Sequence, residues 1–235
     1  VIGLLAAAPR DLTAPIRVGG GIAEWIWKGS DKAATAEAEA TVSYPHATVP
    51  YREAEAVLKH RMRLGNLAYR TELREEAIEL IAVRGKRSYP PLSVYTYDPM
   101  RAVLSVRERI DEPQEPEKGR RVTVIPTDEL KRDQSILSQR RDPQLFPELT
   151  YLADQFSGIS LYREWRFGRS APGRAPQRAD LPDDFLLEDL SNLGLALNDL
   201  ENQPRTRGLI LERLRVFWED IEALSTKVHA NTVQI

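Results

Sequence analysis

Apolar and polar residues alternate along much of the first half of the chain, a pattern typical of β-strands that bury one face. The alternation is clearest over residues 60–75, where one slip at Gly65-Asn66 predicts a bulge or a tight turn. Residues 93–106 predict a hairpin that turns at Asp98-Pro99. Further short strands are expected at residues 40–51, 77–83 and 121–126. Strands of this kind form antiparallel sheets.

The first forty residues are more varied. Val1 to Ala8 predicts the end of a helix that Pro9 stops, followed by a loop over residues 9–21. The glycine triplet at 19–21 lacks the Lys-Ser/Thr of a P-loop, so we interpret it as a flexible turn. Residues 22–27, with Trp25 and Trp27 two apart, fit a strand or a helical turn, and residues 30–40 fit a helix or the approach to a strand.

A helical period replaces the alternation in the second half. Helices are expected over residues 127–140, capped by Thr127 or Asp128, over residues 188–202, and from Pro204 onward. Another helix has an apolar stripe of Leu145, Leu149, Leu152 and Phe156. Strands are expected at 159–165 and at the C-terminal end, and an extended loop at 168–184.

These elements predict an α+β fold, with an antiparallel β-rich first half and a helix-rich second half. We expect a β-rich domain at residues 1–126 and a helical domain with returning strands at 127–235. Residues 112–119 contain two prolines and no apolar residue, which is typical of a linker.

Composition excludes several classes of site. The chain has 235 residues, a net charge of −2 and no cysteine, so disulfides, thiol nucleophiles and zinc-thiolate centres are excluded, and a reducing cytoplasm is the expected location. No apolar run approaches the roughly 20 residues that span a bilayer, so no membrane partner is expected.

No complete catalytic motif is present. The histidines do not have metal-ligand spacing, so no metal site is expected, and each is expected at the surface or at a strand edge: His46, His60 and His229. The carboxylate pairs Glu75-Glu76 and Asp183-Asp184 are expected on solvated faces or loops. No catalytic residue is therefore assigned.

Arginines are concentrated between residues 161 and 178, where five of them surround Trp165 and Phe167 and only Glu164 is acidic. The five are Arg163, Arg166, Arg169, Arg174 and Arg178. Arginines interleaved with aromatic rings can bind a phosphate backbone and stack on bases. Residues 180–189 supply five acids, so internal neutralisation or packing against a partner is the alternative.

Three stretches together resemble a group of bacterial predicted AAA-type ATPases related to the SMC, RecF and OLD proteins, which have an ABC-type head. They are SILSQRRDPQLFPELTYLADQFSGISLYREWRFGR (135–169), EDLSNLGLALNDL (188–200) and LLAAAPRDLTAPIRVGGGIAEWIWKG (4–29). The resemblance implies an internal region of an α/β head, with the P-loop before Val1 and the signature and Walker B acids after Ile235. The chain begins in an apolar segment and ends in a strand-like pattern, as such a region would.

The resemblance also implies partners and site residues. The parent enzyme would bind ATP and Mg²⁺ between two heads of a homodimer, with DNA as a further partner, whereas this chain alone would not bind ATP tightly or hydrolyse it. Gln139 corresponds to the Q-loop, and Arg10 and Arg17 would reach nucleotide phosphates. Members of that group tend to have glycine at the position of Leu190, so it stays open whether a tight helix cap forms there. The alternative function is a non-catalytic interaction or nucleic-acid-binding module that uses residues 161–178.

Overall fold

The computed structural model describes residues 1–26, 28–29, 35–45, 55–84, 87–88, 90–107, 120–163, 165–201, 203–229 and 231–234. They form two compact units, Val1–Ile159 and Ser160–Ile235. The predicted linker at 112–119, His46 and Trp27 lie outside the described residues. The fold is mixed α+β, as predicted in general terms.

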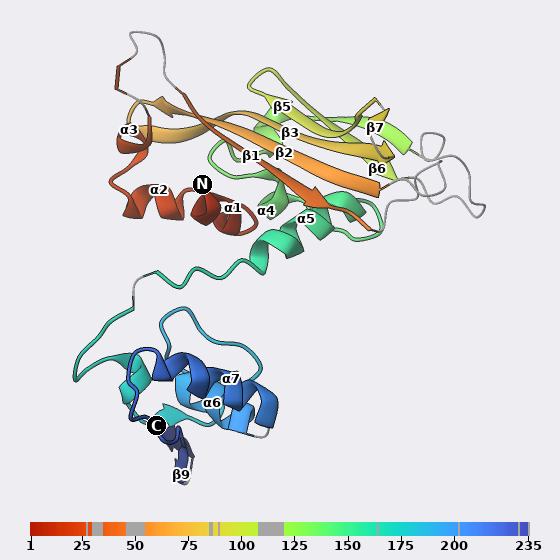
Figure 1. Cartoon of the computed structure of the whole chain (residues 1–235). Coiled ribbons are helices and arrows are strands. Elements are labelled where there is room, and N and C mark those ends of the chain that lie inside the picture. Colours follow the sequence, from red (N-terminus) through yellow and green to blue (C-terminus); the bar gives the residue numbers. More distant parts are fainter. Residues whose placement is uncertain are drawn as a thin grey trace. The chain divides into compact units, whose positions relative to one another are not determined.

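One antiparallel sheet forms the frame of the first unit, with strand order β1-β2-β3-β5-β6-β7 (Figure 1). A short β4 (Arg87–Ser88) pairs with the end of β3. The six main strands are β1 (Thr35–Ser43), β2 (Glu55–Leu67), β3 (Arg70–Arg84), β5 (Leu92–Asp98), β6 (Arg101–Arg107) and β7 (Arg120–Ile125). The outer face of β1, β2 and β3 carries cross-strand ion pairs, such as Lys59–Glu39 at 3.0 Å, so this face is solvated.

The β2–β3 hairpin contains both a bulge and a tight turn. Arg63 pairs with Glu75 but Leu64 pairs with Leu73, so Arg74 is an extra residue in β3, beside the predicted slip. The turn is formed by Ala68-Tyr69 and not by Gly65-Asn66. The predicted turn at Asp98-Pro99 is confirmed, because Asp98 Oδ1 accepts hydrogen bonds from the backbone N–H groups of Met100 (2.8 Å) and Arg101 (3.0 Å).

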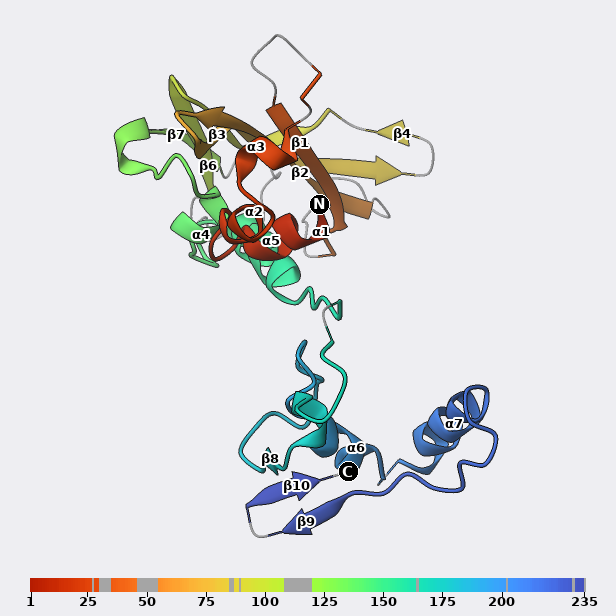
Figure 2. The same ribbon diagram turned by 90° about the vertical axis from the view of Figure 1, so that its left-hand side faces the viewer.

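Short helices cover the other face of the sheet (Figures 1 and 2). They are α1 (Ile2–Ala7), α2 (Ala14–Val18), α3 (Ile22–Trp25), α4 (Ile136–Gln139) and α5 (Pro147–Ser157), with a 3-10 turn η1 (Thr127–Glu129). Helix α2 lies inside the predicted loop 9–21. The single helix predicted over 127–140 is wrong, since only η1 and the one-turn α4 form there. Ser135 is the cap of α4, because its Oγ accepts from the N–H of Leu137 at 3.2 Å.

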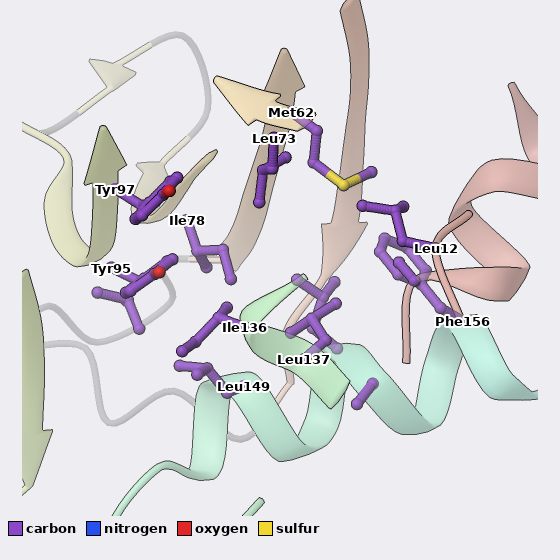
Figure 3. Packing of buried hydrophobic residues seen from close by; sticks show 14 of the residues in the cluster. Leu12, Met62, Leu73, Ile78, Tyr95, Tyr97, Ile136, Leu137, Leu149 and Phe156 are labelled. Atoms are coloured by element: carbon purple, nitrogen blue, oxygen red, sulfur yellow. The ribbon is translucent and has the colours of Figure 1, made fainter. Parts of the chain in front are cut away.

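The core lies between the helices and the inner face of the sheet. Figure 3 shows Leu149 and Phe156 of α5 and Ile136 and Leu137 of α4 on one side, with Met62, Ile78 and Tyr95 from the strands. Leu149, Leu152 and Phe156 of the predicted stripe are buried. Leu145 precedes the helix and is 44% exposed, so it does not belong to the stripe.

The second unit is small. A three-stranded sheet in the order β8-β10-β9 joins β8 (Gln177–Arg178), β10 (Thr232–Gln234) and β9 (Lys227–His229), and it accompanies a 3-10 turn η2 (Pro172–Arg174) and helices α6 (Leu193–Glu201) and α7 (Pro204–Arg215). The strand predicted at 159–165 is wrong, because its described residues belong to no strand. The units divide at 159/160 and not at 126/127, because α4 and α5 pack into the core of the first unit.

Candidate functional site

A cavity of about 550 Å³ opens in the first unit where three distant parts of the chain meet. We call it the arginine pocket, because Arg17, Arg70 and Arg132 line it. Its remaining lining comes from the segments 13–22, 67–72 and 132–133. A volume of this size is within the range of about 300–1,000 Å³ that is usual for small-molecule sites.

The first wall is α2 with the glycine turn that follows it. Arg17 Nη2 lies 2.6 Å from Asp11 Oδ2, and its Nη1 donates to Thr13 Oγ1. Hydrogen bonds that Arg17, and then the Thr13 hydroxyl, donate to the Asp11 carboxyl hold its pKa well below its usual range. Gly20 and Gly21 have φ of 90° and 89°, which side chains rarely adopt. The turn is tied back by the Gly21 N–H, which donates to the Ile16 carbonyl at 2.8 Å.

The second wall is the tip of the β2–β3 hairpin. Leu67 pairs with Arg70, so Ala68 and Tyr69 form a two-residue loop, and both have positive φ, 49° and 65°. Asn-Gly is the usual occupant of such a turn, and an ordinary side chain in this conformation costs about 1–2 kcal/mol per residue. Tyr69 is 93% exposed at the rim of the pocket. Strained residues of this kind cluster at ligand sites.

The third wall is the loop that precedes α4. Gln139 accepts from the N–H of Lys131 at 2.8 Å and donates to the carbonyl of Gln134 at 3.0 Å. Gln134 in turn donates to Asp11 Oδ1 at 3.1 Å, and the Arg132 carbonyl accepts from the N–H of Leu73 at 2.6 Å. Gln139 therefore holds the loop that presents Arg132 and does not itself line the pocket.

Two carboxylates also line the pocket, Glu72 and Asp133. Glu72 is 4% exposed and lies 3.0 Å from Arg74 Nε, a guanidinium that packs directly over Gly65. A Cβ at Gly65 would lie 2.9 Å from that nitrogen, so a larger residue there would displace the Arg74 side chain. Glu72 Oε1 also lies 3.8 Å from Arg132 Nη1, so Arg74 and Arg132 share the charge of Glu72. Around the pocket, the guanidinium groups of Arg17, Arg70, Arg74 and Arg132 outnumber the carboxylates of Asp11, Glu72 and Asp133 by one, and guanidinium groups are suited to phosphate or carboxylate groups.

The sequence-predicted site residues fall in different places. Arg17 lines the pocket, Gln139 lies behind its wall, and Arg10 is exposed and is not a lining residue. Arg163, Arg166, Arg169 and Arg174 belong to the second unit, where all four are exposed.

Tyr69, Arg70 and Arg132 were not predicted. The two-residue spacing between the strands could have identified Tyr69 as a turn residue. Nothing local marks Arg132, which reaches the pocket through tertiary contacts.

A second polar cluster is buried beneath α4. Glu76 Oε1 lies 2.9 Å from His60 Nε2 and accepts from Ser135 Oγ at 2.5 Å, while its Oε2 accepts from the N–H of Ile136 at 2.9 Å. His60 and Ser135 are 0% exposed and Glu76 is 1% exposed, so the predictions of a surface His60 and a solvated Glu76 are wrong. His229 is exposed, as predicted. Enclosure in the core makes this cluster a structural anchor for α4.

Comparisons with known proteins add no identity: no protein-family model matches the chain, and no match was found among curated proteins or among solved structures. Within the described residues, no group of three or more His, Asp or Glu side chains could hold a metal ion. None of the helices in the described part of the chain has the length and apolar character needed to cross a membrane.

Proposed function

We propose that this chain forms part of the head of a cytoplasmic ABC-type P-loop ATPase, and that its arginine pocket contacts the phosphates of the bound nucleotide. The observation that carries the proposal is the convergence of Arg17, Arg70 and Arg132 on one cavity of about 550 Å³ beside a glycine turn. Guanidinium groups match phosphate oxygens in charge and in hydrogen-bond geometry.

Each wall has a separate role in this proposal. Arg17 is oriented by Asp11 and Thr13, so its position is fixed before a ligand arrives. Arg132 is carried by the loop that Gln139 holds, which makes Gln139 a positioning residue. When bound, ATP and Mg²⁺ supply the phosphoryl group and its counter-charge, and a P-loop and a Walker B acid elsewhere in a head dimer complete the site.

The reading frame around this segment tests the family assignment. We expect it to encode GxxxxGK[ST] shortly before Val1 and an acid-ended apolar strand after Ile235. A reading frame that lacks both motifs would overturn the ATPase proposal, whatever the pocket binds.

Nucleotide titration of the protein encoded by the complete reading frame tests the pocket. Arg17→Ala and Arg132→Ala should each weaken ATP binding by roughly tenfold, because each removes a charge-assisted hydrogen bond. Arg101→Ala changes an exposed arginine at the start of β6, outside the pocket, and should leave the affinity unchanged. Unchanged affinity in both pocket variants would place the phosphates elsewhere.

A further inference from the structure

Two exposed aromatic residues of the second unit, Trp165 and Phe167, lie among arginines. They belong to the residues Leu161–Arg163 and Trp165–Arg174, which we call the arginine-aromatic segment. Phe167 is 85% exposed and Trp165 is 42% exposed, and their rings meet edge to face with centroids 6.5 Å apart. Gly168, with φ of 112°, turns the chain directly after Phe167. The two rings are therefore presented to solvent at a bend.

Both ends of this segment are anchored. At the start, Tyr162 Oη donates to the Leu186 carbonyl at 2.7 Å, and the N–H of Leu161 donates to Glu188 at 2.6 Å. At the other end Ala171 is buried and is the N-cap of the 3-10 turn η2. The exposed rings thus belong to a segment that is fixed on both sides.

The four arginines of the segment are available to a ligand. Arg163, Arg166, Arg169 and Arg174 are exposed, and their side chains form no ion pair or hydrogen bond with any residue that the structure describes. The fifth arginine of the region, Arg178, is different, because it is paired with Asp180 at 2.5 Å.

Of the five acids at residues 180–189, Asp180 forms an ion pair with an arginine that the structure describes, and two others accept hydrogen bonds from uncharged groups. Asp180 is held by Arg178, and Glu188 accepts from the backbone of Leu161. The backbone and hydroxyl of Ser191 lower the pKa of Asp189, to which Arg166 adds only a lesser electrostatic contribution. Direct ion pairing with residues 180–189, the alternative raised by the sequence, therefore accounts for Arg178 among the described residues, and the other four arginines form no such pair.

We propose that the arginine-aromatic segment binds single-stranded nucleic acid, with phosphates on Arg166, Arg169 and Arg174 and unpaired bases stacked on Trp165 and Phe167. Stacking requires an exposed base face, which a single strand offers and the interior of a duplex does not. A purely electrostatic site would gain nothing from two exposed rings. This inference does not rest on the proposed function, since it concerns the other unit.

Fluorescence anisotropy of a labelled oligothymidylate with the 235-residue chain tests the proposal. Binding should weaken with salt, and Phe167→Ala should weaken it by roughly tenfold. Because Phe167 is 85% exposed, its replacement leaves the fold intact. The double variant Arg166→Ala/Arg169→Ala should lower the slope of log affinity against log salt by roughly 1.4, about 0.7 for each lost contact.

Two controls define the outcomes. Arg205→Ala removes an exposed arginine of α7 in the same unit and should leave the affinity within about twofold, below the effect of a stacked base. A duplex of the same sequence should bind more weakly and without sensitivity to Phe167. No binding at low salt overturns the proposal, as does binding that Phe167→Ala does not change. Capture of an acidic peptide in preference to the oligonucleotide would show a protein-binding surface instead.

Discussion

The two units differ sharply in what stabilises them. Among the described residues, all but three of the buried hydrophobic side chains belong to the first unit; the exceptions are Ala171, Leu195 and Val233. The first unit is therefore stabilised mainly by apolar burial, at roughly 25 cal/mol per Å². The second unit buries too little apolar surface to depend on the same mechanism.

Side-chain amides organise the second unit instead. Asn192 is 0% exposed and makes three hydrogen bonds: it accepts from the N–H of Leu187 (2.8 Å) and donates to the carbonyls of Pro182 (2.8 Å) and Phe185 (2.6 Å). Gln177 accepts from the N–H of Gly194 at 2.5 Å. These bonds close the irregular chain over residues 182–194. Each candidate site therefore belongs to a unit with a different kind of support, an apolar core for the arginine pocket and a polar network for the arginine-aromatic segment.

The largest effect is expected at the polar cluster of Glu76, His60 and Ser135, which is buried in the otherwise apolar core of the first unit. Glu76→Ala leaves the buried donors of His60, Ser135 and Ile136 without an acceptor, so we expect the free energy of unfolding of this unit to fall by about 3–5 kcal/mol. Glu75→Ala is the matched control, since Glu75 pairs with Arg63 on the exposed face and should cost less than about 1 kcal/mol. Equal losses in urea unfolding would contradict the anchoring role of Glu76.

Asn192→Ala should break the second unit and spare the first. Three buried hydrogen bonds are lost, which we expect to lower the stability of this unit by roughly 2–4 kcal/mol. Hydrogen exchange read by mass spectrometry resolves the two units. Asn198→Ala removes one partly buried bond to Thr226 and should cost about 1 kcal/mol. Faster exchange in the first unit as well would show that the units do not unfold separately.

The hairpin tip allows the first unit to be stabilised without touching its core. The double variant Ala68→Asn/Tyr69→Gly places favoured residues at two positions of positive φ. The free energy of unfolding of this unit should therefore rise by about 1 kcal/mol, and its melting temperature should rise with it. Both residues are exposed, so no packing is lost. A lower melting temperature would mean that Tyr69 makes a stabilising contact of its own. If the ring serves a ligand, the same variant gains stability and loses affinity.

The smallest effect concerns pH and the wall of the pocket. Hydrogen bonds to Asp11, led by that of Arg17, lower its pKa in the folded state. The stabilisation is therefore fully present above the unfolded pKa of about 4 and is lost progressively as pH falls from there through the lower folded pKa. Asp11 is 42% exposed, so the advantage of the wild type over Asp11→Asn should remain below about 1 kcal/mol near pH 7. Urea unfolding at about pH 7 and pH 3 measures it. A difference that does not shrink in acid would contradict this origin.

Local patterns predicted the strands of the first unit better than its helices, since the single helix expected over 127–140 is absent and α2 lies in an expected loop. Alternation located the strands, because burial of one face imposes a period of two, and Asp98-Pro99 located its turn through short-range hydrogen bonds. The same alternation contained the signal that His60 and Glu76 are buried, since each lies two residues before a core residue, Met62 and Ile78. The polar character of His60 and Glu76 predicted exposure, whereas their positions in the alternation predicted burial. The structure shows that both are buried.

Contacts between distant parts of the chain could not be predicted from the sequence in the same way. The pocket combines residues as far apart as Arg17 and Arg132, and no spacing rule links them. Leu190 shows the limit of residue preference. Its φ of 64° lies in the left-handed region that glycine adopts most readily, and the turn forms there despite the leucine. Helix α6 consequently begins at Leu193 and not at residue 188.

The proposed function requires that nucleotide contacts the first unit at the arginine pocket. Hydrogen exchange of the protein encoded by the complete reading frame, with and without ATP, tests it most directly. ATP should slow exchange in the three lining segments, residues 13–22, 67–72 and 132–133. Protection confined to other segments, with these three unchanged, would contradict it.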